Sequence, residues 1–92
     1  MGEQDAILVI DHDPDAALLL SDFLEREGYA VAVARTGAEG LRLIRRNTFA
    51  LVLLELDLPD ADGASLMREA GQGDTPPEII VVTGRATLDS AI

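Results

Sequence analysis

Short apolar runs alternate with amphipathic segments along this chain. The runs lie at 6–10 (AILVI), 51–54 (LVLL) and 78–82 (EIIVV), and a fourth stretch at 29–34 (YAVAVA) alternates valine with alanine. Each run is too short for a helix and rich in branched side chains, which favours β-strands. Because residues 51–54 are apolar without interruption, they predict a central strand that is covered on both faces.

The segments between these strands carry the start and stop signals of helices. Asp13 followed by Pro14 is typical of an N-cap with proline at the first helical position, and Gly28 is a helix stop. Between them, alanine, leucine and phenylalanine recur at helical spacing. Thr36 and Glu39 have the spacing of a capping box, which predicts that a second helix starts there.

The second helix is expected over 38–46, and a short third helix over 64–70. A fourth helix is expected to begin at Leu88 and to be cut off where the sequence ends. Strands therefore alternate with helices along the whole chain, which is the pattern of a parallel sheet with helices on both faces. The sequence predicts one α/β domain over 1–92, with three α/β/α layers.

Composition narrows the classes of function. The 92 residues include 17 acidic and 7 basic ones, and the net charge of −10 argues against direct binding to nucleic acid or to an anionic membrane. With no cysteine and one histidine, the sequence excludes thiol catalysis, iron–sulfur clusters and multi-histidine zinc sites. No apolar run approaches the ~18 residues of a membrane span, and no signal segment is present, so we expect a cytoplasmic protein.

Polar residues follow the strands at their carboxyl ends. Asp11 and His12 come after the first strand, Glu55 and Asp57 after the central strand, and Thr83 after the last one. The carboxyl ends of parallel strands lie at one edge of the sheet, and open α/β sheets bind their ligands at that edge. The sequence therefore predicts a site there, in which any metal ion is held mainly by oxygen.

Taken together, these strand ends resemble the receiver domain of response regulators in two-component signalling. The resemblance covers the whole chain and includes the turn LPDADG at 58–63. It implies a CheY-like, flavodoxin-like doubly wound sheet with strand order 2-1-3-4, whose fifth strand and helix would lie beyond Ile92. It also implies protein partners, namely a histidine kinase and an output domain, and a role in transcription regulation.

The resemblance assigns a role to each polar strand end. In that family the acid that ends the third strand takes a phosphoryl group from the kinase, and this position falls on Glu55, not on an aspartate. The family's acidic pair after the first strand falls on Asp11 and His12, so histidine occupies the position of a direct Mg²⁺ ligand. Thr83 matches the switch hydroxyl, and Asp57 matches the residue that gives the metal a backbone carbonyl. The expected metal ligands are therefore Asp11, Glu55 and Asp57.

The two replacements weaken both requirements of phosphoryl transfer, which are an in-line nucleophile and a hard cation beside it. Glu55 carries its carboxylate about 1.3 Å further out than aspartate would, and a displacement of this size can cost on the order of 10²-fold in rate. His12 offers nitrogen where Mg²⁺ prefers oxygen. We expect a weak Mg²⁺ site and a receiver that is independent of phosphorylation or imitates it.

Two other functions remain open from the sequence. A receiver that still accepts phosphate at Glu55 or Asp57 would regulate a transcription-activator output domain. A small phosphatase-like enzyme would use the same two acids, because Glu55-Leu-Asp57 resembles the paired acids of haloacid-dehalogenase-type phosphatases. That family also uses aspartate as its nucleophile, and this chain has Pro59 where the family usually has threonine or valine. We therefore favour a signalling module over an enzyme.

Other charged residues have a structural interpretation. Asp13, Asp60 and Asp62 are expected to cap helices and turns, and the arginines at 42, 45 and 46 are expected at a solvated helix end. The last strand, at 78–82, would be an apolar edge if the fifth strand is missing. Such an edge is a template for another chain, so we expect a dimer or larger assembly that pairs through it.

Overall fold

A computed structural model of the chain describes residues 6–55, 58, 60, 63–72 and 76–82. Its elements are, in chain order, β1 (Ala6–Ile10), α1 (Pro14–Arg26), β2 (Ala30–Ala34), α2 (Gly37–Arg46), β3 (Leu51–Leu54), α3 (Gly63–Ala70) and β4 (Glu78–Val81). Their ends agree with the predicted ones within one or two residues. The helix expected from Leu88 lies outside the described residues.

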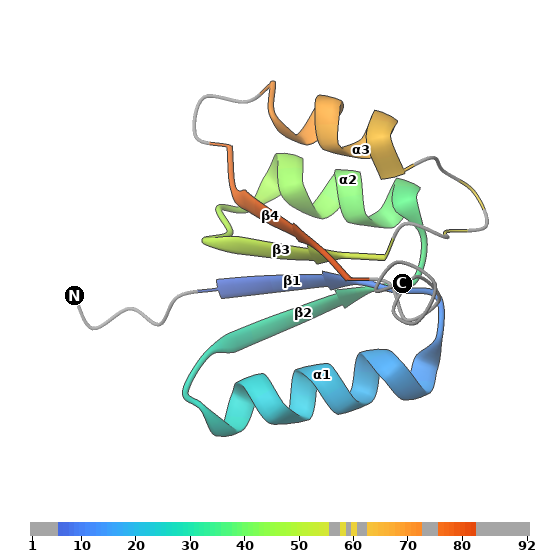
Figure 1. Cartoon of the computed structure of the whole chain (residues 1–92). Helices are drawn as coiled ribbons and strands as arrows, with labels where there is room; N and C mark the ends of the chain where they lie inside the picture. Colours follow the sequence, from blue (N-terminus) through green and yellow to red (C-terminus); the bar gives the residue numbers. More distant parts are fainter. Residues whose placement is uncertain (1–5, 56–57, 59, 61–62, 73–75, 83–92) are drawn as a thin grey trace, which may run out of the picture.

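The four strands form one parallel sheet in the order β2-β1-β3-β4, as predicted. Ile10 at the end of β1 pairs with Ala34 of β2 and with Leu54 of β3, so the carboxyl ends of the three strands are level. Figure 1 shows α2 and α3 on one face of the sheet and α1 on the other. The predicted doubly wound α/β/α architecture is confirmed.

Local capping signals explain where the helices begin and end. The Asp13 carboxylate accepts a hydrogen bond from the amide of Asp15 at 3.0 Å, and the Thr36 hydroxyl accepts one from the amide of Glu39 at 3.1 Å. Both side chains satisfy amides that a helix leaves without partners in its first turn. Gly28, just after α1, has φ 99°, a left-handed conformation that glycine adopts at little cost.

The hydrophobic core lies between the sheet and the layer formed by α2 and α3. Its buried members alternate along the strands and are joined by residues of the connecting segments and of α3: Leu8, Ile10, Ala34, Phe49, Val52, Leu54, Leu58 and Leu66. Gly40 allows α2 to approach the sheet closely, because a Cβ atom there would lie 2.6 Å from Cδ1 of the fully buried Ile10. The predicted inner face of α2, with Leu41 and Ile44, packs on this core.

The opposite face of the sheet is less completely covered. Val52 and Leu54 are buried, but Leu51 and Leu53, which point to the other face, are half-buried. The prediction that the central strand is covered on both faces is therefore wrong for the part of the chain that is described. The physical reason is that α1 packs on β1 and β2 and is the one described helix on this side.

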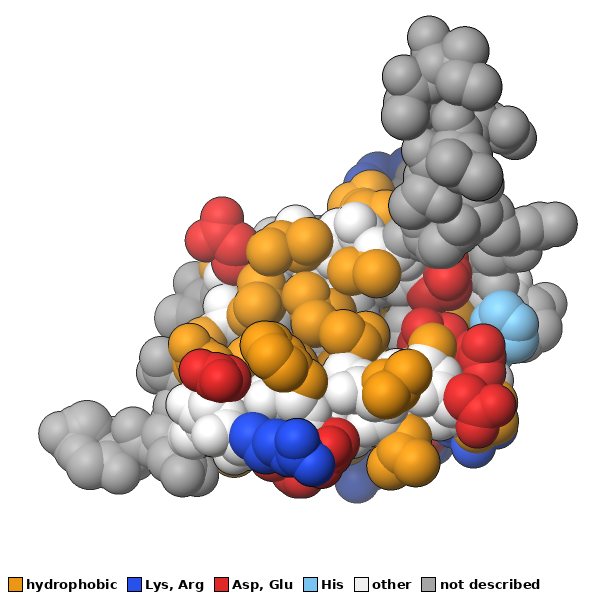
Figure 2. All heavy atoms as spheres, turned by 60° about the horizontal axis from the view of Figure 1, so that its bottom comes forward, with side chains coloured by type: hydrophobic (Ala, Val, Ile, Leu, Met, Phe, Trp, Pro, Cys, Tyr) orange, Lys and Arg blue, Asp and Glu red, His pale blue; other side chains and the backbone are white. Residues whose placement is uncertain are grey.

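Helix α1 itself presents more apolar surface than the sheet buries. Ala17 is buried, whereas Leu19 and Phe23, which belong to the predicted helical pattern, are 73% and 60% exposed. Figure 2 shows hydrophobic side chains gathered over the sheet and α1 on this face. Within the described residues, no helix is long and apolar enough to cross a membrane.

Candidate functional site

The sheet register brings the ends of β1 and β3 together. The amide of Glu55 donates to the carbonyl oxygen of Ile10 at 2.9 Å, and the amide of Asp11 donates to that of Ala34 at 3.0 Å. Each of these bonds continues the strand pairing by one residue beyond the sheet. Asp11 and Glu55 therefore lie next to each other at the carboxyl edge, where the sequence placed its candidate site.

Asp11 is held in place by the turn that it begins. It is 6% exposed, and its Oδ1 accepts a hydrogen bond from the amide of Asp13 at 3.0 Å. Asp13 in turn caps α1, so the two acids order the whole connection between β1 and α1. Among the described side chains, every buried polar atom has a hydrogen-bond partner. The Asp11 carboxylate is thus a fixed group at the edge of the sheet.

The remaining candidates differ in how much the structure says about them. Glu55 is half-buried, and His12 is exposed. Asp57 and Thr83 lie outside the described residues, so the roles that the resemblance gives them stay predictions. The described part of the site is therefore an acid on each central strand, with an imidazole at the surface beside the first of them.

The donor types can be compared with the needs of a magnesium ion, which takes a near-octahedral set of oxygen ligands. Asp11 and Glu55 supply carboxylate oxygens, which are the right kind of donor. In the described part of the chain, no group of three or more acidic or histidine side chains is placed to hold an ion. The described residues thus fit a hard cation in chemical type and provide part of the predicted ligand set.

The structure adds one residue whose partner the sequence did not reveal. Oδ1 and Oδ2 of Asp60, between β3 and α3, accept hydrogen bonds from the amides of Gly37 at 2.8 Å and Ala38 at 3.1 Å. These amides begin α2, and their hydrogen bonds lower the pKa of the Asp60 carboxyl group. The predicted capping role is confirmed, but the helix lies 23 residues earlier, a contact that no local spacing signals.

We expect Asp60 to stabilise the fold at neutral pH and to lose this effect in acid. Because its pKa is lower in the folded chain, the stabilisation is fully present above the unfolded pKa and disappears as the pH falls through the folded one. Asp60→Ala should therefore lower the melting temperature at neutral pH, and the difference should shrink towards pH values of about 2. Thermal unfolding followed by circular dichroism measures this. An equal difference at both pH values would contradict the assignment.

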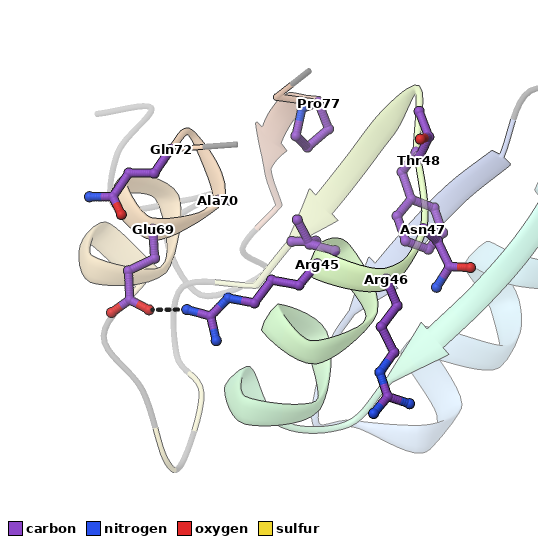
Figure 3. A pocket seen from close by; sticks show the side chains of 10 residues that line it. Arg45, Arg46, Asn47, Thr48, Glu69, Ala70, Gln72 and Pro77 are labelled. Atoms are coloured by element: carbon purple, nitrogen blue, oxygen red, sulfur yellow. Dashed lines mark hydrogen bonds and ion pairs between the residues drawn. The ribbon is translucent and has the colours of Figure 1, made fainter. Parts of the chain in front are cut away.

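A cavity of about 370 Å³ lies away from this edge, where α2 ends and β3 and β4 begin. In Figure 3, Arg45 reaches from α2 toward Glu69 of α3, and their side chains form an exposed ion pair at 3.5 Å. Arg46 points away from Glu69 in the same view. These arginines lie at the exposed end of α2, as predicted, and the cavity is separate from the edge that carries Asp11 and Glu55.

Comparison with known proteins identifies the class. The sequence matches the response regulator receiver domain over residues 7–92, which is nearly the whole chain. The chain therefore belongs to the receiver domains of response regulators, which are signalling modules of two-component systems. The resemblance seen in the strand ends is confirmed, together with the CheY-like fold that it implied.

Individual relatives give the family a context. The chain is 34% identical over 86 residues to the transcriptional regulatory protein GlrR of Escherichia coli K12, which covers 94% of this chain and 19% of that protein. It is similar to a solved CheY-like receiver domain from Methanospirillum hungatei JF-1, with 35% identity, a TM-score of 0.86, and coverage of 97% of this chain and 71% of that one.

A further solved relative carries a metal. The response regulator TrrA from Thermotoga maritima, solved in complex with Mg²⁺ and BeF, shares 28% identity with a TM-score of 0.84, covering 97% of this chain and 77% of that one. The chain spans from 19% to 40% of the length of the curated relatives it matches. What the rest of those proteins does is therefore not carried by the matched part.

Proposed function

We propose that this chain is a degenerate receiver, a module that signals through protein contacts and does not run the usual phosphorylation cycle. The observation that carries the proposal is the position of Glu55. Its amide bonds to Ile10 at the end of β1, which places a glutamate beside Asp11 at the family's phosphoacceptor position. The family's chemistry depends on an aspartate there.

The fixed backbone makes the extra methylene group of Glu55 significant. Because the backbone hydrogen bond to Ile10 holds residue 55 in sheet register, the longer side chain must place its carboxylate further from the strand. A phosphoryl group would then have to be accepted at a displaced point, and such displacements cost on the order of 10²-fold in reactions that depend on positioning. This supports a pocket that reacts poorly with phosphodonors.

The metal site of the proposal is weak for a related reason. Asp11, Glu55 and the backbone carbonyl of Asp57 would hold Mg²⁺, and a bound ion would neutralise charge on a transferring phosphoryl group. Asp11 already orders the turn through the amide of Asp13 at 3.0 Å. His12 is exposed and offers nitrogen at the position of the second acid. The TrrA complex shows that such a site binds Mg²⁺ in a relative.

The partners in this proposal are proteins. A histidine kinase or an output domain is the expected partner, and the name of GlrR supports a role in regulating transcription. The net charge of −10 favours partners other than nucleic acid or an anionic membrane and is consistent with a cytoplasmic module. The proposal includes no enzymatic turnover. Steady hydrolysis of a generic phosphate ester in the presence of Mg²⁺ would contradict it.

We expect Glu55 to imitate part of the phosphorylated form. Its carboxylate extends toward the place of phosphoryl oxygens near Thr83, but it carries less charge and fewer acceptors, so only a partial shift between two states is expected. Amide chemical shifts of the unchanged chain and of Glu55→Asn should differ as far as Thr83 and Gly84. If the shifts are identical beyond the immediate neighbours of residue 55, Glu55 does not act in this way.

Self-association is a separate part of the proposal. In the described sheet β4 is an edge strand, with β3 on one side of it. The amides of Glu78 and Val82 donate to β3, so those of Ile79 and Val81 point away from the sheet. We propose that this edge pairs with a second copy of the chain, which would give a dimer or larger assembly.

A further inference from the structure

Three strand residues form an apolar strip on the α1 side of the sheet. Leu51 and Leu53 of β3 are half-buried, and Ile80 of β4, which pairs with Leu53, is 48% exposed. The three side chains share a face because neighbouring residues of a strand point to opposite sides. On the far side of the same strands, Val52 and Leu54 are buried under α2 and α3.

Helix α1 extends this strip sideways. Leu19 and Phe23 lie one helical turn apart and are 73% and 60% exposed. A right-handed helix that follows β1 in a right-handed crossover presents this flank to β3 and β4, and it presents Leu18 on the opposite flank. Figure 2 shows the hydrophobic side chains of this face continuing from the sheet onto α1. We call these five residues the apolar surface: Leu19, Phe23, Leu51, Leu53 and Ile80.

The shape of the apolar surface matches one helix. Two helices, α2 and α3, lie on the far face of the sheet, whereas α1 is the one described helix on this face and packs on β1 and β2. The part over β3 and β4 beside α1 therefore has the width of one more helix, which needs about 10 Å with its side chains. Its floor is the sheet, and its wall is the flank of α1.

The charges around the apolar surface select the kind of helix. The segment from the N-cap to the C-cap of α1 contains Asp13, Asp15, Asp22, Glu25 and Glu27, against one arginine, Arg26, which pairs with Asp22 at 3.2 Å. Glu78 adds an exposed acid on the same face of β4. The arginines of the other described helices, Arg42, Arg45, Arg46 and Arg68, belong to the opposite layer. Figure 2 shows acidic side chains at the margin of the hydrophobic region.

We propose that the apolar surface is a docking site for an amphipathic helix of a partner polypeptide, with an apolar stripe and basic flanks. Its leucine or isoleucine side chains pack on Leu53, Ile80 and Phe23, and its lysine or arginine side chains lie over the acidic margin. Helix-in-groove binding of this kind uses apolar anchors at helical spacing, and complementary charge adds specificity and speeds association. The proposal does not rest on the phosphorylation chemistry of Glu55.

A pair of synthetic peptides tests the charge selection. Both form the same helix with the same leucine stripe, but one carries lysine and the other glutamate at every flanking position. Titration of the full chain, followed by amide and methyl chemical shifts, should show binding of the lysine peptide with shifts centred on Leu53 and Ile80. Affinity should fall as salt is added, because the charge contribution is screened. The glutamate peptide should bind at least about 10-fold more weakly.

Variants on the exposed flank of α1 test the location without disturbing the core. Leu19→Gln together with Phe23→Gln should weaken binding of the lysine peptide about 10-fold or more, since both side chains lie in the contact. Leu18→Gln is the matched control, because Leu18 is 67% exposed on the opposite flank of the same helix. It should bind the peptide as the unchanged chain does, and thermal unfolding verifies that all the variants are folded.

Other outcomes would overturn the proposal. Equal affinity for the two peptides would show that charge does not select the occupant. Shifts centred on α2 and α3 would place the binding elsewhere. A dimer that buries Leu19 and Phe23 and that the lysine peptide does not dissociate would assign the apolar surface to a second copy of this chain.

Discussion

Replacing Glu55 with aspartate and His12 with aspartate in the same chain is expected to produce a protein that acetyl phosphate labels in the presence of Mg²⁺. The first change returns the carboxylate to the distance that the family uses, and the second adds an oxygen ligand next to Asp11. Since the backbone of residue 55 is already bonded to Ile10, the new aspartate needs no rearrangement of the strand. Intact mass spectrometry should show a gain of one phosphoryl group.

The single variants separate the two contributions. Glu55→Asp alone corrects the nucleophile but leaves His12 beside Asp11, so labelling should be slower and should need more Mg²⁺. His12→Asp alone improves the metal site but leaves the displaced carboxylate, so little labelling is expected. If all three variants stay unlabelled while thermal unfolding shows them to be folded, the two replacements do not explain the degenerate site.

Replacing Ile80 with lysine is expected to convert an assembly of this chain into a monomer. Each large apolar side chain left in water forgoes roughly 1.5–3 kcal/mol of hydrophobic stabilisation, a large share of the 5–15 kcal/mol that stabilises a typical domain. Pairing of β4 with a second copy would recover part of this and would satisfy the outward amides of Ile79 and Val81. A lysine on an edge strand opposes such pairing. Sedimentation at micromolar concentration measures the change.

Two further variants make this test specific. Val81→Pro removes an outward amide, and proline is tolerated on an edge strand where the N–H side faces solvent, so it should also give a monomer. Leu18→Lys adds the same charge on the outer flank of α1, far from the edge in the fold, and should leave the assembly intact. A compact, stable monomer of the unchanged chain would show that the β4 edge is not a liability.

The elements were predictable because their signals are local. Asp13 and Thr36 accept hydrogen bonds from amides two and three residues later, so short sequence patterns record them directly. The adjacency of Asp11 and Glu55 was predictable for another reason. Parallel strands bring their carboxyl ends to one edge, and the register of β1 with β3 places these two residues there.

Features that depend on distant neighbours were not predictable from the pattern. Residues 51–54 are apolar throughout, which suggested cover on both faces, but Leu51 and Leu53 are half-buried because α1 packs on β1 and β2. The sequence alone does not state how far a helix extends across a sheet. Asp60 was expected to cap or turn its own segment, whereas it caps α2, since that contact depends on how the β3–α3 connection packs.

The unchanged chain, treated with acetyl phosphate and Mg²⁺ and then mapped by tandem mass spectrometry, tests the central claim most directly. The expected result is no gain of a phosphoryl group on any acid, under conditions in which the double variant at positions 12 and 55 is labelled. That comparison excludes inactive reagent as the cause. A phosphoryl group mapped to Glu55 or to Asp57 in the unchanged chain would contradict the claim and identify a receiver that still runs its phosphorylation cycle.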